Sequence, residues 1–220
     1  MRILFQGDSI TDGNRYQDEE RRWDLNHQIG HSYAFTVSGT LGARYPQANL
    51  TFINRGISGN RTQDLLKRWD TDTIAEHPDL LSLLVGVNDA NGTPTPPGEF
   101  EKNLTELLKR TFEANPHLRV ILMAPFMLNV GNYEDENNAS VLLVKEYAAI
   151  AEQVASRYDA VTLVKLQPVL DRVCALREKK YWLWDGVHPT ESGHALLAKL
   201  WLDAFEKMFV DSLPTPSGLV

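Results

Sequence analysis

Short apolar runs alternate with longer amphipathic stretches along the whole chain, and this rhythm constrains the fold more than any other feature. It is typical of strand–helix–strand units around a parallel sheet whose two faces are both covered. Runs rich in Val, Ile, Leu and Phe predict five strands, at residues 2–6, 50–54, 80–85, 119–124 and 160–164. Helical spacing predicts helices at residues 33–44, 63–75, 100–114, 141–157 and 191–208. We therefore expect a three-layer α/β/α sandwich around a five-stranded parallel sheet.

The length of 220 residues fits one domain of ordinary size. We expect this domain to span residues 1–210, followed by a tail at residues 211–220. The tail contains two prolines and a glycine, which predicts an extended or frayed end. Pro189 stands where the last helix would begin, and proline is well tolerated in a first helical turn because its missing N–H would have no partner there. We therefore expect that helix to start just after His188.

Charge and composition exclude several classes of function. The chain has 22 Lys and Arg against 29 Asp and Glu, a formal net charge of −7, whereas gripping nucleic-acid phosphates requires dense basic charge. No apolar run approaches the roughly 20 residues of a membrane helix. The apolar stretch at the amino terminus is too short for a signal peptide, so we expect a cytoplasmic protein. Neither nucleic acid nor a membrane is an expected partner.

The cysteine and histidine content predicts neither a disulfide nor a metal site. Cys174 is the only cysteine, and it has no Cys or His neighbour at metal-ligand spacing. The six histidines show no paired ligand pattern. We expect a protein that works without a metal or a cofactor.

A serine follows the first predicted strand in a turn of small residues. The segment at residues 7–13 reads Gly-Asp-Ser-Ile-Thr-Asp-Gly, so Ser9 would lie at a strand-to-helix turn with its hydroxyl exposed. The same residues are typical of a helix N-cap, because Ser and Asp both favour that position. A serine nucleophile also needs a general base and a third group that orients the base.

Asp185 and His188 supply that pair near the far end of the chain. In a tight turn, a spacing of three lets the Asp185 carboxylate reach the Nδ1–H of His188 and leaves Nε2 free to accept the serine proton. A lone histidine is more often a surface or core residue than a catalyst. Here the aspartate, the histidine and a helix start occur together, which favours a catalytic role.

Two further turns could supply hydrogen-bond donors for the oxyanion of an acyl-transfer reaction. Gly56 lies in the turn after the second strand, where a glycine lets a backbone N–H approach a substrate closely. Asn88 lies in the turn after the third strand. Asn and Gly are also ordinary turn residues, so neither turn is specific by itself.

Taken in order, the four turns resemble the SGNH (GDSL-type) hydrolase superfamily, in which Ser, Gly, Asn and His head the conserved blocks. The corresponding residues here are Ser9, Gly56, Asn88 and His188. The resemblance implies a flavodoxin-like SGNH hydrolase fold and a catalytic triad of Ser9, Asp185 and His188. It also implies an oxyanion hole made by the amides of Ser9 and Gly56 and the side chain of Asn88. The Gly-x-Ser-x-Gly elbow of α/β-hydrolases is absent.

The extended forms of these blocks are similar to those of intracellular bacterial acetylxylan esterases. The segments at residues 54–60 and 184–189 carry this closer resemblance. It implies a serine esterase that removes acetyl groups from short acetylated xylo-oligosaccharides, without a cofactor, as a homo-oligomer that is an octamer in those enzymes. A lysophospholipase or thioesterase of the same superfamily is an alternative. So is a non-catalytic flavodoxin-like module that binds a phosphate at the turn at residues 7–13.

Aromatic residues near the predicted site are candidates for contact with a sugar. Trp184 and Tyr181 come just before the Asp–His turn, and Trp23 lies in the polar loop after the serine. Flat aromatic faces can stack on sugar rings. They also serve as core or subunit-interface anchors, and the sequence leaves both roles open for each residue.

Overall fold

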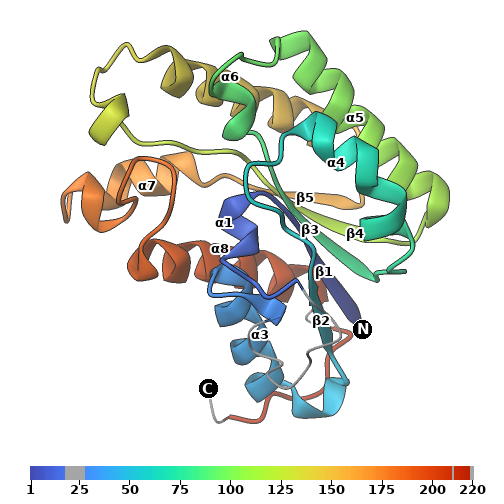
Figure 1. Cartoon of the computed structure of the whole chain (residues 1–220). Helices are drawn as coiled ribbons and strands as arrows, with labels where there is room; N and C mark the ends of the chain where they lie inside the picture. Colours follow the sequence, from blue (N-terminus) through green and yellow to red (C-terminus); the bar gives the residue numbers. More distant parts are fainter. Residues whose placement is uncertain (18–27, 210, 219–220) are drawn as a thin grey trace.

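The sheet has five parallel strands in the order β2-β1-β3-β4-β5 (Figure 1). The computed structural model describes residues 1–17, 28–209 and 211–218. Leu4 pairs with Ile53 on one side and with Leu81 on the other. The order is that of flavodoxin-like folds, as expected, and the predicted strands are confirmed to within a residue at each end. The strands are β1 (Arg2–Gly7), β2 (Thr51–Asn54), β3 (Leu80–Leu84), β4 (Arg119–Met123) and β5 (Val161–Val164).

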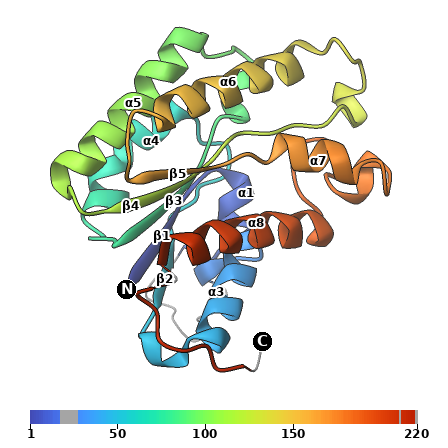
Figure 2. The ribbon, with the colours of Figure 1, turned by 180° about the vertical axis from the view of Figure 1, so that it is seen from behind.

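Helices cover both faces of this sheet, which confirms the three layers (Figures 1 and 2). On one face α3 (Tyr33–Arg44) packs against α8 (Glu191–Phe209). On the other face lie α4 (Thr62–Trp69), α5 (Pro97–Ala114) and α6 (Ala139–Ala155). Two short helices, α1 (Ser9–Asp12) and α7 (Gln167–Val173), follow the carboxyl ends of β1 and β5. Short 3₁₀ helices occupy Pro46–Ala48, Asn88–Ala90, Gly131–Tyr133 and Lys179–Tyr181.

The helix predicted at residues 63–75 is divided in the structure. It is regular only over α4, and a wider π turn follows at Asp70–Ile74, where the Ala75 N–H donates to the Asp70 carbonyl. The sequence predicted a strand-to-helix turn at Ser9 but no bounds for α1, and it did not predict α7. Both are too short for helical periodicity, which becomes readable only over roughly 11 residues or more.

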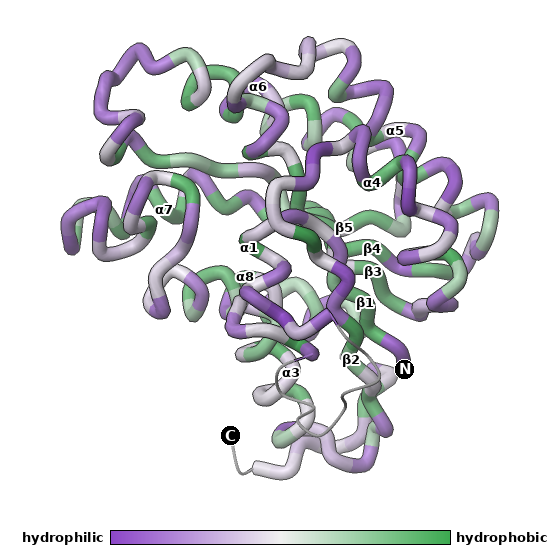
Figure 3. The backbone as a smooth tube through the Cα atoms, in the orientation of Figure 1, coloured by the Kyte–Doolittle hydropathy of each residue, from purple (hydrophilic) through white to green (hydrophobic). Residues whose placement is uncertain are grey.

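The central strands are buried, and a chain of buried polar groups runs from β3 to the neighbouring helices. All five residues of β3 are buried, including Ser82. The Ser82 Oγ accepts a hydrogen bond from Trp201 Nε1 at 2.9 Å and lies 3.2 Å from the Tyr33 hydroxyl, which lies 3.3 Å from Thr11 Oγ1. These contacts connect β3 with α8, α3 and α1, so they hold α1 above the core. Figure 3 shows the apolar character of the central strands against the mixed outer helices.

The described part of the tail is attached to the domain. Ser217 donates from its backbone N–H to the Arg44 carbonyl and from its hydroxyl to the Ala43 carbonyl, both at 2.8 Å. Of the two predicted alternatives, an extended or a frayed end, the described segment is not frayed, because the exposed carbonyls at the end of α3 accept its donors. Of the helices in the described ranges, none combines the length and apolar character needed to cross a bilayer.

Candidate active site

The nucleophile turn places Ser9 as the first residue of α1, directly after β1. The Asp8 carboxylate caps this helix by accepting the Ile10 N–H at 3.0 Å, and Gly13 ends it with a left-handed φ of 55°. The N-cap role that the sequence left open therefore belongs to Asp8, and the Ser9 hydroxyl is free for other contacts. A side chain at Gly7 would lie 2.2 Å from the Leu84 carbonyl oxygen, so this glycine lets β1 end close against β3.

Ser9, His188 and Asp185 form a continuous chain of contacts. The Ser9 Oγ lies 2.9 Å from Nε2 of His188, and Nδ1 of His188 lies 2.7 Å from the Asp185 Oδ2. The carboxylate holds Nδ1–H and leaves Nε2 as the acceptor facing the serine. Partial burial alone would raise the pKa of Asp185, but hydrogen bonds from His188 and Val187 outweigh it, so the pKa lies below its usual value. The ionised form is therefore favoured. This is the arrangement that activates a serine nucleophile.

The loop from Leu183 to Pro189 is built so that aspartate and histidine meet. The Asp185 Oδ1 accepts the backbone N–H groups of Val187 and His188 at 2.9 and 2.7 Å, which folds the turn back on itself. Pro189 forms a bridge with Leu183, and α8 begins only at Glu191. The prediction that Pro189 starts the helix is therefore wrong, because this proline closes the loop that carries His188.

Thr190 caps the last helix instead. Its Oγ1 accepts the backbone N–H of Gly193 at 3.2 Å, which satisfies one of the unpaired donors in the first turn of α8. Gly193 also lets the helix approach the loop closely, because a side chain there would lie 2.2 Å from the Trp182 carbonyl oxygen. The first turn of α8 is thus fixed against the loop that carries His188.

A cavity of about 630 Å³ opens beside Ser9 and His188. Its wall includes Trp184, Pro189 and Gly13, and its described lining contains no Val, Leu, Ile or Met. The other lining residues are polar: Asn14, His31, Ser58, Thr190, Glu191 and His194. The size suits a small ligand, and a wall that mixes polar side chains with apolar surface suits one that carries both oxygen atoms and carbon–hydrogen faces.

Of the three aromatic residues predicted to contact substrate, the structure brings Trp184 to the cavity. Its side chain is 60% exposed, and its ring is stacked against the His188 ring with centroids 5.8 Å apart. Tyr181 does not line this cavity, because its ring packs edge-on against Trp182 and beneath the Arg177 guanidinium. Trp23 lies outside the described residues.

Two of the three predicted oxyanion donors, Gly56 and Asn88, already have partners in the structure. The Gly56 N–H donates to the Asn54 side-chain oxygen at 2.8 Å, and a side chain at Gly56 would lie 2.5 Å from the Asp12 backbone nitrogen. Close packing against α1 therefore explains this glycine. One N–H of the Asn88 side chain donates to the Asn60 carbonyl at 3.1 Å, which leaves its second N–H available. The turn of Asn88 is held by Asp89, whose carboxylate accepts the Thr62 N–H and hydroxyl.

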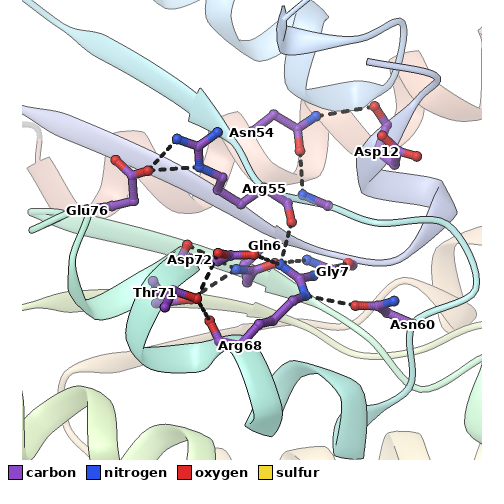
Figure 4. A network of polar contacts seen from close by, with 12 residues as sticks. Gln6, Gly7, Asp12, Asn54, Arg55, Asn60, Arg68, Thr71, Asp72 and Glu76 are labelled. Carbon is purple, nitrogen blue, oxygen red and sulfur yellow. Dashed lines mark hydrogen bonds and ion pairs between the residues drawn. The ribbon is translucent and has the colours of Figure 1, made fainter. Parts of the chain in front are cut away.

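A network around Arg68 connects the end of β1 with the turn that follows β2 (Figure 4). The guanidinium donates to the carbonyls of Gly7 and Arg55 at 3.3 and 2.8 Å and to the Asn60 side-chain oxygen at 2.8 Å. The Asn60 carbonyl in turn accepts the Asn88 side chain. Asp72 on the same face of the helix pairs with Arg68 at 3.0 Å. One side chain thus fixes the spacing between the nucleophile turn and the Asn88 turn.

Two ionisable groups near the site were not predicted to be functional. Burial raises the pKa of Asp8 to about 7, and its Oδ2 is enclosed without a hydrogen-bond partner. The half-buried His194 lines the cavity, although no catalytic role was predicted for it. The available signal was its helical spacing: it lies three residues after Glu191 in the first turn after the His188 loop, so both side chains share a face.

Across the described ranges, no three His, Cys, Asp or Glu side chains gather as metal ligands. A model of the GDSL-like lipase/acylhydrolase family matches residues 5–196. The chain belongs to this family. The protein is accordingly a carboxylic ester hydrolase, and a purely ligand-binding flavodoxin-like module is set aside.

Other members of the family share most of the length of the chain. An acetylxylan esterase from Geobacillus stearothermophilus is 32% identical over 208 residues, which cover 91% of this chain and 92% of that protein. Its crystal structure has a TM-score of 0.78, with 92% of this chain and 93% of that chain covered. A putative GDSL-like lipase from Parabacteroides merdae has a TM-score of 0.85 at 33% identity, with 92% and 94% covered. Structures of the Geobacillus enzyme include catalytic mutants in which a serine, a histidine or an aspartate is replaced by alanine.

Proposed function

We propose that the protein is a serine esterase that removes acetyl groups from carbohydrates, short acetylated xylo-oligosaccharides above all. The observation that carries this proposal is the wall of the cavity beside Ser9. It combines polar side chains with the exposed face of Trp184, which suits the hydroxyl groups and the flat face of a sugar ring. The similarity to an acetylxylan esterase supports the same substrate class.

A lipolytic esterase of the same family is the alternative. A long acyl chain needs an apolar channel, because burying its CH₂ groups contributes about 0.8 kcal/mol each. The described wall of the cavity offers no Val, Leu, Ile or Met side chain for this purpose. An acetyl group needs no such channel, so the polar wall favours a short acyl group on a polar alcohol.

The chemistry that we propose has two half-reactions. The Ser9 Oγ attacks the ester carbonyl as Nε2 of His188 takes its proton, and Asp185 stabilises the resulting imidazolium. When the carbon–oxygen bond to the sugar breaks, His188 gives the proton to the leaving oxygen. Water then attacks the acetyl-enzyme with His188 again as the base. Acetate leaves, and Ser9 regains its proton.

Four donors are candidates for the oxyanion hole. The Ser9 N–H is the first donor of α1 and so has no acceptor within the helix. The second N–H of the Asn88 side chain is available. The role of Gly56 stays a prediction, and it requires the bond to Asn54 to break. The Gly59 N–H is an alternative, because it has no acceptor among the described residues and lies next to Ser58 at the cavity wall.

Assembly as a homo-oligomer and a cytoplasmic location stay predictions. An octamer follows only from the resemblance. Light scattering at several protein concentrations tests the assembly, and a monomer at every concentration would refute it. Cell fractionation tests the location.

The substrate is tested by acetate release from acetylated xylotriose and from p-nitrophenyl esters of increasing chain length. We expect the purified enzyme to deacetylate the oligosaccharide, and we expect kcat/KM to fall by at least about 100-fold from the acetate to the decanoate, since no apolar contacts offset the longer chain. The Ser9→Ala variant is the control for uncatalysed release. A higher kcat/KM on the decanoate, or no activity on any sugar acetate, would refute the proposal.

A further inference from the structure

We propose that His194 determines specificity for the alcohol part of the substrate, by donating a hydrogen bond from its Nε2–H to an oxygen atom of the sugar in the cavity beside Ser9. The inference deepens the proposed function and rests on it. It assigns His194 to ligand binding rather than to proton transfer.

The first part of the argument is the position of His194. The residue lies in the first turn of α8, and its backbone N–H donates to the Thr190 carbonyl at 2.8 Å. It lines the same cavity as Ser9, His188 and Trp184. A ligand that presents its ester to Ser9 therefore has its alcohol part within a space that His194 helps to enclose.

The second part is the fixed orientation of the ring. The backbone N–H of Tyr33 donates to Nδ1 of His194 at 3.1 Å. Tyr33 is the first residue of α3, so its N–H has no acceptor inside its own helix, and the imidazole supplies one. Because Nδ1 is the acceptor in this bond, the neutral ring carries its proton on Nε2.

The third part is the charge of the ring. Burial lowers the pKa of His194 to about 4, and the nearby positive charge of a protonated His188 lowers it further, against a smaller opposite effect of Glu191. The ring is therefore neutral at pH 7. A group that stays neutral through the reaction is a poor proton carrier but a constant hydrogen-bond donor.

The fourth part is that the Nε2–H group is available to donate a hydrogen bond. This atom has no acceptor in the described part of the chain, and it does not belong to the enclosed polar atoms that lack a partner. It is therefore open to the cavity. A donor that cannot accept selects for an oxygen acceptor, such as a sugar hydroxyl or ring oxygen, and it complements the ring face offered by Trp184.

Two substitutions separate the two nitrogens of His194. In His194→Asn the amide oxygen can take the place of Nδ1 and keep the Tyr33 bond, but no donor reaches the position of Nε2. In His194→Gln the amide nitrogen can take the place of Nε2, but the acceptor for Tyr33 is lost. His117→Asn is the matched control, because His117 is exposed in the loop before β4, at the other end of the sheet.

The measurement is the selectivity ratio, the kcat/KM for acetylated xylobiose divided by that for p-nitrophenyl acetate. We expect His194→Asn to lower this ratio about tenfold through a higher KM for the sugar ester, as the loss of one hydrogen bond allows. We expect His194→Gln to retain most of the ratio and to lower Tm by about 2–4 °C, because the Tyr33 N–H loses its acceptor. His117→Asn should change neither quantity.

A measurement on the wild-type enzyme does not depend on the folding of a variant. The ¹⁵N resonances of His194 should show the neutral form with the proton on Nε2, and the Nε2 resonance should shift on addition of xylotriose. The inference would be overturned if the Nε2 resonance did not shift at saturating xylotriose. It would also be overturned if His194→Asn had the same selectivity ratio as the wild type. An enzyme inactive on every sugar acetate refutes the proposed function and this inference together, whereas activity with an unchanged ratio in His194→Asn refutes the inference alone.

Discussion

The Ser9 Oγ lies 2.9 Å from Nε2 of His188, although 179 positions separate the two residues in the chain. The contact exists because β1 is an interior strand that ends next to the point where the strand order reverses, and the loop before α8 reaches the same edge of the sheet. Nothing in either segment alone specifies the distance.

Removal of Ser9 or His188 should abolish nearly all turnover. A serine hydroxyl ionises poorly at neutral pH, so the nucleophile and its base act as a unit. We expect Ser9→Ala or His188→Ala to lower kcat by about 10⁶-fold and Asp185→Ala by about 10⁴-fold, since the aspartate orients the base but takes no proton. Steady-state kinetics with p-nitrophenyl acetate measure the effect, with circular dichroism as the control for folding. Equal losses in the three variants would contradict the distinct role of Asp185.

Activity should survive chelation. A serine nucleophile with its own base needs no metal-bound water, so incubation with EDTA followed by gel filtration should leave kcat/KM within about twofold of its initial value. Activity that is lost with EDTA and restored by zinc or magnesium would count against the serine mechanism.

Arg68 should matter for turnover more than for substrate binding. Arg68 connects the Gly7 carbonyl with Asn60, and Asn60 accepts a hydrogen bond from the Asn88 side chain. Loss of Arg68 should therefore shift Asn88, a candidate donor to the oxyanion of the transition state. We expect Arg68→Gln to lower kcat about 10- to 100-fold with KM within about twofold, and Arg68→Lys to recover part of the loss.

Arg110→Gln is the matched control for Arg68. Arg110 donates to the Leu66 carbonyl on α4 and pairs with Asp70, so it braces the same helix without contact to the end of β1 or the turn that follows β2. If both variants lose the same Tm and the same kcat, Arg68 has only a structural role.

Asp8 should make stability depend on pH. Its pKa is raised from 3.8 to about 7, chiefly by burial, so between these values the folded protein retains a proton that the unfolded chain has lost. The contribution of Asp8 to the free energy of unfolding should therefore be greatest below about pH 4, fall as the pH rises to about 7, and level off above it. The nearby charges of His188 and Asp89 modify the pKa of Asp8 in opposite directions.

The comparison for Asp8 is Asp8→Asn, which keeps an acceptor for the Ile10 N–H and cannot ionise. Urea unfolding from pH 4 to pH 8 should show the wild type losing stability relative to the variant as the pH rises. His194 has a lowered pKa, so its own contribution to stability rises with pH up to about 6.5. This contribution is the same in wild type and variant, and it cancels in the difference between their stabilities. A stability difference between wild type and variant that is constant across this range would show that folding does not raise the pKa of Asp8.

Local patterns in the sequence predicted the strands, most helices and the Asp185–His188 pair. Each of these depends on a short window: apolar runs, helical spacing, or a carboxylate three residues before a histidine. The failures also have local causes. Residues 167–173 are too few for a periodic signal, and Pro189, read as a helix start, instead forms a bridge with Leu183.

The tertiary structure alone decided which distant partners the polar groups take. The sequence predicted that Ser9 and His194 lie at a turn and in a first helical turn. The Ser9 hydroxyl contacts His188, 179 positions away, and Nδ1 of His194 accepts the Tyr33 N–H, 161 positions away. The physical reason is that hydrophobic periodicity depends only on residues close together in the sequence. A hydrogen-bond partner, in contrast, depends on which strand and helix ends meet at one edge of the sheet, and packing of the whole domain sets that.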